Sequence, residues 1–356
     1  MIDVDPRDCL LRPVIDSDLE SVYELAGKAG RGLTTLPYSK SLLQAKIKDS
    51  VKSFAFMSDR PCGDSYLFVL EDTENEQVLG TSAVFSKVGG FEPFWSYQLD
   101  SRRNCSQVIG VDKEIPFLRI KKVHSGPTEI GTLYLQKEYR GNVQGRLLSL
   151  GRFLFIRNYP ASFEKTIIAE LRGKIDDQGQ YPFWNAIGAN FFDVSFDTVD
   201  QMVNVDKHFI SELMPTEPIY IELLPKEARD AIGSVHPNTK PARALLEQQG
   251  FQFMNEVDIF EGGPMYGCSV ENIQSVTQSV VEKVYKIDGE VRWGEKTYLL
   301  SNFVDPMNFR ACLGNFSKSA TGEITISERI AELLKIKLGD SLVATPMFSK
   351  NQKDPL

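Results

Sequence analysis

The stretch between residues 129 and 158 constrains the fold of this chain more than any other part of the sequence. Residues 129–135 (EIGTLYL) predict a strand, and residues 146–158 predict a helix with one packed face. The loop 140–145 between them contains two glycines. Free backbone N–H groups at a helix N terminus, together with the positive end of the helix dipole, favour a bound pyrophosphate. Such loops are also common as plain structural turns, so the flanking segments have to decide between the two interpretations.

The segments on either side predict alternating helices and strands. A short strand near residues 10–14 precedes two amphipathic helices, and the second of these helices begins at about Ser39. Later in the chain a helix ends at Gly250, a favourable C-terminal cap, and Phe251 opens a strand. The other predicted elements are strands at 65–72, 77–88 and 165–171 and a helix at 239–249.

Two regions differ from the rest of the chain in their sequence pattern. Residues 89–128 give no clear pattern, and a lid is one interpretation of them. From about residue 275 the sequence predicts short strands with polar turns and a short helix at 327–335. We therefore expect residues 1–274 to form one region and residues 275–356 to form a small β-rich C-terminal module.

Composition excludes several classes of protein. The chain has 356 residues, of which 42% are hydrophobic and 25% charged, as in ordinary globular proteins. The net charge of −8 argues against a nucleic-acid-binding protein. The five cysteines are scattered and form no Cys-x-x-Cys pair, so we expect no metal site. No apolar run is long enough to cross a membrane, and the first residues lack the build of a signal peptide. We expect a soluble, cytoplasmic protein with no membrane partner.

The loop at 140–146 supplies the candidate cofactor contacts. Arg140, Gly141, Gln144, Gly145 and Arg146 combine small residues, which allow close approach, with side-chain donors at the edge of the loop. The order of elements around this loop resembles the acyl-CoA N-acyltransferase superfamily, also called GNAT-like. In that superfamily a loop of pattern Arg/Gln-x-x-Gly-x-Gly/Ala holds the pyrophosphate of CoA. This chain has Val143 where the pattern has its middle glycine.

The resemblance implies an α+β fold in which helices flank a mixed central sheet, followed by the small β-rich module. It leaves open whether the acyltransferase half is duplicated. It also implies a contact between CoA and Leu133, made through the main chain of the strand at 129–135.

Several blocks of sequence resemble one family within that superfamily, the arginine N-succinyltransferases. The blocks are GRGLTTLP (30–37), ELRGKIDDQGQYPFW (170–184), SELMPTEPIY (211–220), IGSVHPNTKPARALLEQQGF (232–251) and DIFEGGP (258–264). Members of the family transfer a succinyl group from succinyl-CoA to the α-amine of L-arginine, which yields N2-succinyl-L-arginine and CoA and opens arginine catabolism by the succinyltransferase pathway. The resemblance therefore implies succinyl-CoA as a co-substrate, no permanently bound cofactor, and a homo- or hetero-oligomer.

Four residues are candidates for the chemistry and for substrate binding. The resemblance gives His236, which stands just before the helix at 239–249, the role of proton donor, and histidine is the side chain best suited to proton transfer near neutral pH. Glu170 and Asp176 are candidates for binding the guanidinium of arginine, and Arg172 for a carboxylate of arginine or of succinyl. Charged residues at a strand end are also commonly solvated or paired with one another, so their individual roles stay open.

Two alternatives remain at this point. The same fold could act on ornithine or on another amine. The chain could also be a non-catalytic acyl-CoA-binding partner subunit, an interpretation that Val143 favours and that His236 opposes.

Overall fold

The computed structural model describes residues 8–30, 32–90, 92–289 and 297–347. One long sheet runs through these residues, with its strands in the order β14-β15-β11-β16-β12-β13-β1-β2-β3-β6-β7-β10-β9-β4-β5-β8. Neighbouring strands are antiparallel except in the pairs β6–β7 and β11–β15, which are parallel. The strands are β1 (Cys9–Pro13), β2 (Ser65–Asp72), β3 (Gln77–Phe85), β4 (Phe94–Ser106), β5 (Val111–Val123), β6 (Thr128–Leu135), β7 (Thr166–Glu170), β8 (Ile219–Tyr220), β9 (Gln252–Val257), β10 (Pro264–Ser269), β11 (Val280–Asp288), β12 (Tyr298–Asn302), β13 (Ala311–Gly314), β14 (Ser317–Lys318), β15 (Ile324–Ser327) and β16 (Ser341–Pro346).

Helices cover both faces of the central strands. In β2, Tyr66 and Phe68 face a core shared with α3, while Leu67 and Val69 face a core shared with α1 and α2, as the period of two in a strand requires. The helices are α1 (Leu19–Ala29), α2 (Lys40–Ala55), α3 (Val143–Asn158), α4 (Pro182–Ala186), α5 (Ala189–Phe192), α6 (Phe196–Met202), α7 (His208–Leu213), α8 (Lys226–Ala231), α9 (Lys240–Gln248), α10 (Gln274–Thr277) and α11 (Glu328–Leu334). The expected α+β fold, a mixed sheet flanked by helices, is confirmed.

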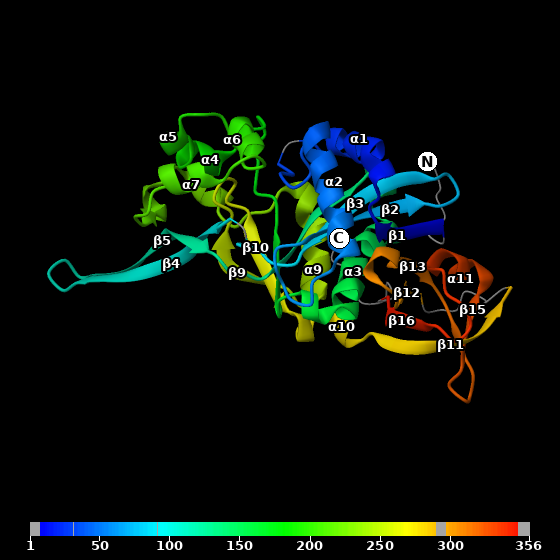
Figure 1. Cartoon of the computed structure of the whole chain (residues 1–356). Helices are drawn as coiled ribbons and strands as arrows, with labels where there is room; N and C mark the ends of the chain where they lie inside the picture. The colour runs from blue at the N-terminus through cyan, green and yellow to red at the C-terminus, as the bar shows by residue number, and fades with distance from the viewer. Residues whose placement is uncertain (1–7, 31, 91, 290–296, 348–356) are drawn as a thin grey trace.

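The region without a clear sequence pattern forms a hairpin arm. Strands β4 and β5 pair along their whole length, from Phe94 opposite Val123 to Ser106 opposite Val111. The arm projects from one end of the molecule, and helices α4 to α7 lie beside its base (Figure 1). A second hydrophobic core joins the base of the arm to these helices, with Tyr97 and Leu118 contributed by the two strands.

Most of the predicted boundaries agree with the structure to within a few residues. The main shift is in the helix expected at 146–158, which already begins at Val143. Asn142 before it is extended, so Val143, Gln144 and Gly145 form the first turn and belong to the helix. Gly250 has a φ of 97°, as expected of a glycine that ends a helix.

Strands β6 and β7 separate soon after they begin. Their pairing consists of Thr128 with Ile167 and Glu129 with Ile168. Further along, β6 carries a bulge opposite β3, where the register shifts between Gly131 and Tyr134. Thr132 within the bulge has a φ of 52°, and its carbonyl oxygen accepts a hydrogen bond of 3.0 Å from the hydroxyl of Thr81. The separation leaves an opening between two adjacent strands of the sheet.

The C-terminal strands continue the same sheet. Strand β13 pairs with β1 through Leu10 opposite Cys312 and Leu11 opposite Ala311. Arg329 of α11 also binds Asp8 at 2.6 Å and the hydroxyl of Thr73 at 2.8 Å. The division of the chain at residue 275 stays a prediction. Among the described residues, no helix is both long and apolar enough to cross a lipid bilayer.

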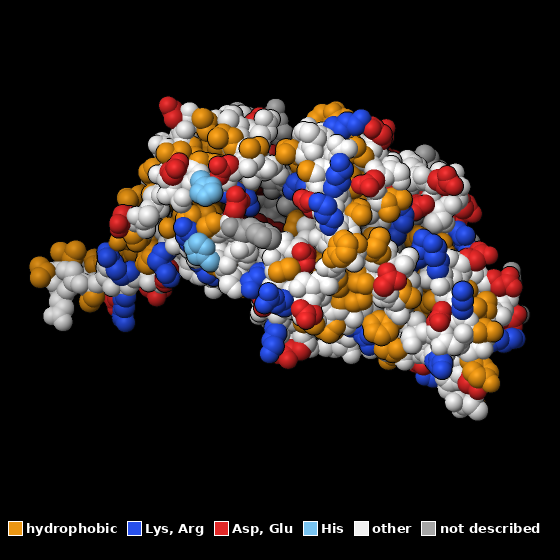
Figure 2. Space-filling model, viewed as in Figure 1, with side chains coloured by type: hydrophobic (Ala, Val, Ile, Leu, Met, Phe, Trp, Pro, Cys, Tyr) orange, Lys and Arg blue, Asp and Glu red, His pale blue; other side chains and the backbone are white. Residues whose placement is uncertain are grey.

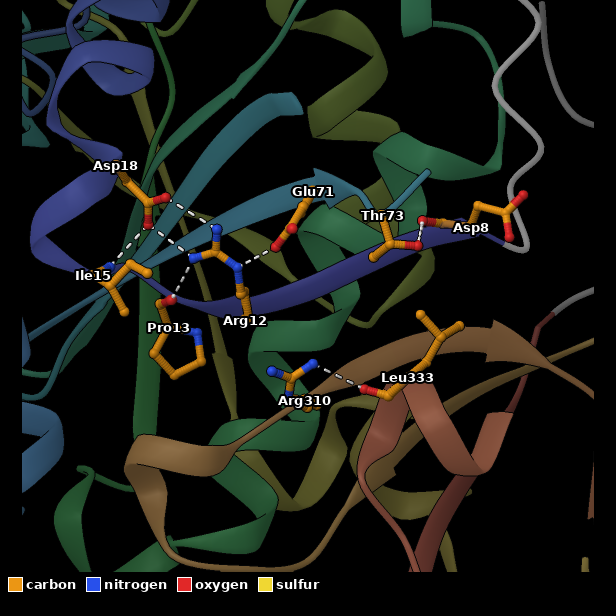
Figure 3. Close-up of polar contacts among 9 residues, drawn as sticks. All are labelled: Asp8, Arg12, Pro13, Ile15, Asp18, Glu71, Thr73, Arg310 and Leu333. Atoms are coloured by element: carbon orange, nitrogen blue, oxygen red, sulfur yellow. Dashed lines mark hydrogen bonds and ion pairs between the residues drawn. The ribbon is translucent and has the colours of Figure 1, made fainter. Parts of the chain in front are cut away.

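A buried ionic cluster fixes the start of the first helical segment against the sheet. Arg12 of β1 donates to both carboxylate oxygens of Asp18, at 2.8 and 3.0 Å, and also binds Glu71 of β2 (Figure 3). Asp18 accepts a further hydrogen bond of 2.9 Å from the backbone N–H of Ile15. The Arg12 side chain is only 14% exposed, so its two carboxylate partners depend on it for their counter-charge.

We predict that Arg12→Met lowers the free energy of unfolding by about 3 kcal/mol, because two largely buried carboxylates lose their cation. Urea denaturation followed by circular dichroism measures the change. Lys40→Met, which removes an exposed ion pair with Glu20, is the control and should leave the midpoint almost unchanged. Equal midpoints for the two variants would contradict the structural role of Arg12.

Candidate active site

A large cavity, of about 1050 Å³, lies where β6 and β7 separate. Its walls come from the loop between α1 and α2, from β6 and β7, from the start of α3, from α6 and α9, and from the loop at 258–261. Figure 2 shows the molecule hollowed between the part that carries α4 to α7 and the part that carries α1 and α2. Phe94 and Trp95, at the base of the hairpin arm, also line it.

One end of the cavity is formed by the predicted cofactor loop. Arg140, Gly141, Gly145 and Arg146 all line it. Arg140 is held in place by a hydrogen bond of 2.8 Å from its Nε to the carbonyl of Leu135, and its guanidinium lies 5.4 Å from the centre of the Tyr134 ring. Gly141 has a φ of 82°, a conformation that favours glycine. Basic side chains and a helix N terminus that open into one cavity suit a pyrophosphate.

The remaining residue of the predicted loop set points elsewhere. Gln144 is only 2% exposed and packs into the protein rather than lining the cavity. Leu133, the predicted main-chain contact, lies in the bulge of β6 and does line the cavity. The bulge takes Leu133 out of register with β3, as expected of a strand segment that offers its backbone to a ligand.

A group of acidic side chains lines the cavity away from the loop: Glu129, Glu170, Asp200, Asp258 and Glu261. Burial raises the pKa values of all five, and repulsion by neighbouring carboxylates adds to the rise at Glu170, Asp200 and Glu261. The pKa of Glu261 rises to about 8, first because of burial and then because of the charge of Asp258. The pKa of Glu129 rises to about 7 and that of Asp200 to about 6, in both cases mainly through burial. A cationic ligand would relieve this crowding of like charges.

Three cations lie among these carboxylates. Lys46 of α2 and Lys207, just before α7, line the cavity, and burial together with the charge of Lys207 lowers the pKa of Lys46. Arg172 follows β7, and its charge counteracts the rise in pKa of Glu261. Gly32 lies directly against Arg172, because a Cβ atom at Gly32 would stand 2.5 Å from the Nε of Arg172. The second glycine of the block at 30–37 therefore leaves room for this guanidinium.

His236 lies at the edge of the cavity rather than in its lining. Its backbone N–H donates to the carbonyl of Arg172 at 2.9 Å, and the residues Asn238 and Thr239 that follow it do line the cavity. The ring Nδ1 accepts the backbone N–H of Asn238 at 3.1 Å, which places the proton of the neutral ring on Nε2. Burial and then the charge of Arg172 lower the pKa of His236, so the ring is neutral at pH 7.

Asp176 is separated from the other candidate residues. Its carboxylate accepts the backbone N–H groups of Gln178 and Gln180, at 2.9 and 2.8 Å, and closes a local turn. It does not line the cavity, whereas Glu170 and Arg172 do. An aspartate two or four residues before its N–H donors is a common turn-forming arrangement.

The structure brings into the cavity several residues that sequence patterns did not single out. Asp258 and Glu261 lie in the block at 258–264, whose only signal in the sequence is its family resemblance. Lys46 and Arg152 are hidden inside amphipathic helices, where a basic residue is ordinarily solvent-exposed. Glu92, which also lines the cavity, forms a group with the exposed Asp206 and His208 in which the ligand atoms lie within 4.8 Å of one another, and exposed acidic groups are common without a metal.

Comparison with known proteins agrees with the resemblance found in the sequence. A family model described as the arginine N-succinyltransferase beta subunit matches residues 9–275. The chain is 38% identical over 349 residues to the arginine N-succinyltransferase of Yersinia pseudotuberculosis, which covers 96% of this chain and 99% of the relative. It is 35% identical over 333 residues to the enzyme of the same name from Shigella sonnei, covering 93% and 95% of the two chains.

The fold is also that of a solved structure. The structure of arginine/ornithine succinyltransferase subunit AI from Pseudomonas aeruginosa superimposes with a TM-score of 0.87 at 31% sequence identity, and the match covers 96% of this chain and 99% of the other. The similarity therefore extends through the C-terminal strands.

We predict that Glu261→Gln weakens the pH dependence of stability. A carboxyl whose pKa is about 8 in the folded chain, against an ordinary value of 4.5, takes up a proton on folding between these pH values, so stability falls as pH rises through this range, by up to about 1.4 kcal/mol per pH unit. The introduced amide would still accept the Gly173 N–H that Glu261 accepts at 2.8 Å. Urea denaturation at pH 5.5, 7 and 8 should show a smaller loss in the variant than in the wild type. The exposed Glu271→Gln serves as control, and parallel curves for Glu261→Gln and wild type would refute the prediction.

Proposed function

The chain belongs to the arginine N-succinyltransferase family, and we propose that it transfers the succinyl group of succinyl-CoA to the α-amine of L-arginine within the cavity between β6 and β7. The products are N2-succinyl-L-arginine and CoA. Acyl-CoA is a co-substrate in this reaction and leaves as CoA in every turnover.

The acidic group is the observation that carries this proposal. L-arginine brings two positive charges, on its guanidinium and its α-ammonium, and one negative charge. Glu129, Glu170, Asp258 and Glu261 are crowded at one end of a cavity whose other end is a basic helix N terminus. A guanidinium adds a positive charge to those of Lys46, Lys207 and Arg172 in this acidic group, and bidentate contacts to carboxylates are the usual mode of guanidinium recognition.

The two ends of the cavity suit the two substrates. The CoA pyrophosphate fits the loop at Arg140 and Gly145, and the thioester then reaches the bulge at Leu133, where a backbone N–H can stabilise the oxyanion that forms as the amine attacks. Glu129, with a pKa of about 7, is suited to accept a proton from the α-ammonium. Among the cations near the acceptor end, Arg172 is suited to bind a substrate carboxylate.

His236 is suited to the last step. Its Nε2–H is free of the hydrogen bond that occupies Nδ1, so it can give this proton to the departing sulfur of CoA while the ring takes up the proton that the attacking amine loses, which leaves the ring neutral. Its backbone link to Arg172 fixes the ring beside the acceptor end of the cavity. Glu170 lies in the lining beside Arg172, and Asp176 stays a prediction that rests on sequence alone.

Ornithine is the second candidate acceptor. The structural relative from Pseudomonas aeruginosa is named an arginine/ornithine succinyltransferase, and ornithine carries a terminal ammonium that carboxylates also bind. We further propose a cytoplasmic, oligomeric enzyme, with a homo- or hetero-oligomer both consistent with the family.

The direct test is release of free thiol from succinyl-CoA by the purified protein, measured with and without L-arginine. Acetyl-CoA and ornithine serve as alternative substrates. Arginine-dependent release that prefers succinyl-CoA supports the proposal. Release with ornithine alone replaces the acceptor, and binding of succinyl-CoA without release with any amine identifies a non-catalytic partner.

We predict that His236→Ala lowers kcat about 10²- to 10⁴-fold, the range typical of a group that transfers a proton in the transition state. The KM for arginine should change little. The exposed His124→Ala is the matched control and should leave kcat unaltered. A kcat near that of the wild type in His236→Ala would remove this histidine from the mechanism.

We predict that Gly145→Leu chiefly raises the KM for succinyl-CoA. A Cβ atom at Gly145 would make only an ordinary contact, 3.7 Å from the Cδ2 of Leu135, so the fold should tolerate it, while the rest of the side chain would enter the cofactor end of the cavity. Steady-state kinetics with succinyl-CoA as the varied substrate measures the effect. An unchanged KM would argue against a pyrophosphate site at this loop.

A further inference from the structure

Arg152 lies in the wall of the cavity and is almost completely buried. It belongs to the third turn of α3, and its relative exposure is 2%. It lines the cavity together with Leu148 of the same helix and Gly131 of β6. Arginine is rarely buried to this degree unless an anion accompanies it.

The contacts of Arg152 in the structure are neutral. Its Nε donates to the carbonyl of Ser149 at 2.9 Å, its Nη2 to the Ser149 hydroxyl at 3.0 Å, and its Nη1 to the carbonyl of Gly131 at 3.3 Å. A guanidinium has five N–H groups, so these three bonds leave donors over. In the part of the chain that the structure describes, Arg152 forms no ion pair, and burial alone lowers its pKa, to about 9.

The neighbours of Arg152 place it beside the bulge of β6, where the proposed function puts the reacting bond. Gly131, whose carbonyl it binds, is two residues from Leu133 and borders the bulge of β6. Arg152 is nine residues into a helix whose N terminus is the cofactor loop, a distance of about 13 Å along the helix axis. The pantetheine arm of a CoA molecule bound at that loop is long enough to carry its acyl group to this depth.

Arg152 also approaches the cavity from a different face of the sheet than Lys46. Helix α3 packs on the face that carries Tyr66 and Phe68, whereas α2, with Lys46, packs on the face that carries Leu67 and Val69. The cavity reaches residues of both helices because β6 and β7 separate. In the proposed function the acidic group and Lys46 therefore face the acceptor, whereas Arg152 enters the cavity from the helix whose N terminus would bind CoA.

We propose that Arg152 binds the terminal carboxylate of the acyl group carried by CoA, and so selects succinyl over acyl groups of equal length that end in a methyl. This inference rests on the function proposed above and names the determinant of its acyl specificity. A buried, charged hydrogen-bonding group strongly rejects a ligand that leaves its donors unpaired.

The acceptor, L-arginine, also carries a carboxylate, on its α-carbon. The experiment distinguishes this carboxylate from the terminal carboxylate of the acyl group. Butyryl-CoA has the chain length of succinyl-CoA but no terminal carboxylate. Agmatine keeps the guanidinium and the primary amine of arginine but has no α-carboxylate. The kcat/KM ratio of succinyl-CoA to butyryl-CoA therefore reports the acyl carboxylate, and the ratio of arginine to agmatine reports the other.

The variants are Arg152→Met, which keeps the volume without the charge, and Arg152→Lys, which keeps the charge. Arg157→Met is the matched control, because Arg157 lies on the same helix, binds the Ser279 hydroxyl at 2.9 Å and does not line the cavity. We expect Arg152→Met to lower the succinyl-to-butyryl ratio about 100-fold, Arg152→Lys to restore part of it, and Arg157→Met to leave it unchanged. The arginine-to-agmatine ratio should stay constant in all three.

Either of two results would overturn the proposal. An unchanged succinyl-to-butyryl ratio in folded Arg152→Met would mean that Arg152 only stabilises the bulge of β6. A structural defect of that kind lowers the activity with both donors alike. A drop confined to the arginine-to-agmatine ratio would assign Arg152 to the acceptor. If the wild type shows no arginine-dependent thiol release, the proposed function fails instead, and calorimetric Kd values for succinyl-CoA and butyryl-CoA still test Arg152 in the same variants.

Discussion

Strands β6 and β7 share two residue pairs near their N-terminal ends and then separate, and the cavity exists because of that separation. An opening inside a sheet exposes backbone groups that would otherwise pair, which is unfavourable unless other partners replace them. The chain meets this need with the bulge at Thr132, held by the hydroxyl of Thr81, and with the guanidinium of Arg152 on the carbonyl of Gly131. The elements that keep the strands apart are thus the ones that shape the cavity in which we propose that acyl donor and acceptor meet.

Basic and acidic side chains line different parts of this cavity. Arg140 and Arg146 stand at the end formed by α3, and Glu261 and Asp258 stand at the other. Burial raises the pKa values of these carboxyl groups and lowers that of Lys46, so the charged forms of all three groups are disfavoured until a ligand compensates them. A site of this kind gives up stability of the free protein for affinity toward ligands of opposite charge, which is a common arrangement where binding is specific.

The order of elements and the position of the glycine-containing loop before α3 could be predicted from the sequence, because strand and helix periodicities and the glycines are local signals. The same holds for Glu170 and Arg172, which end or directly follow a predicted strand and do line the cavity. Asp176 instead accepts a backbone N–H group of its own turn. Gln144 packs inward, because the helix begins three residues before the expected start and turns that side chain toward the core. Lys46, Lys207 and Arg152 come together only through long-range packing of helices and strands, which no local pattern encodes.

Strand β1 is paired on both of its edges, with β2 on one side and with β13 on the other. Leu10 and its partner Cys312 are separated by most of the chain. At ribosomal rates of about 5–20 residues per second, the second edge of β1 stays uncovered for roughly 15–60 seconds of synthesis. During that time an apolar strand edge is available for pairing with another chain. The second edge of β1 therefore stays open to other chains until residues 311–314 have left the ribosome and β13 can pair with it.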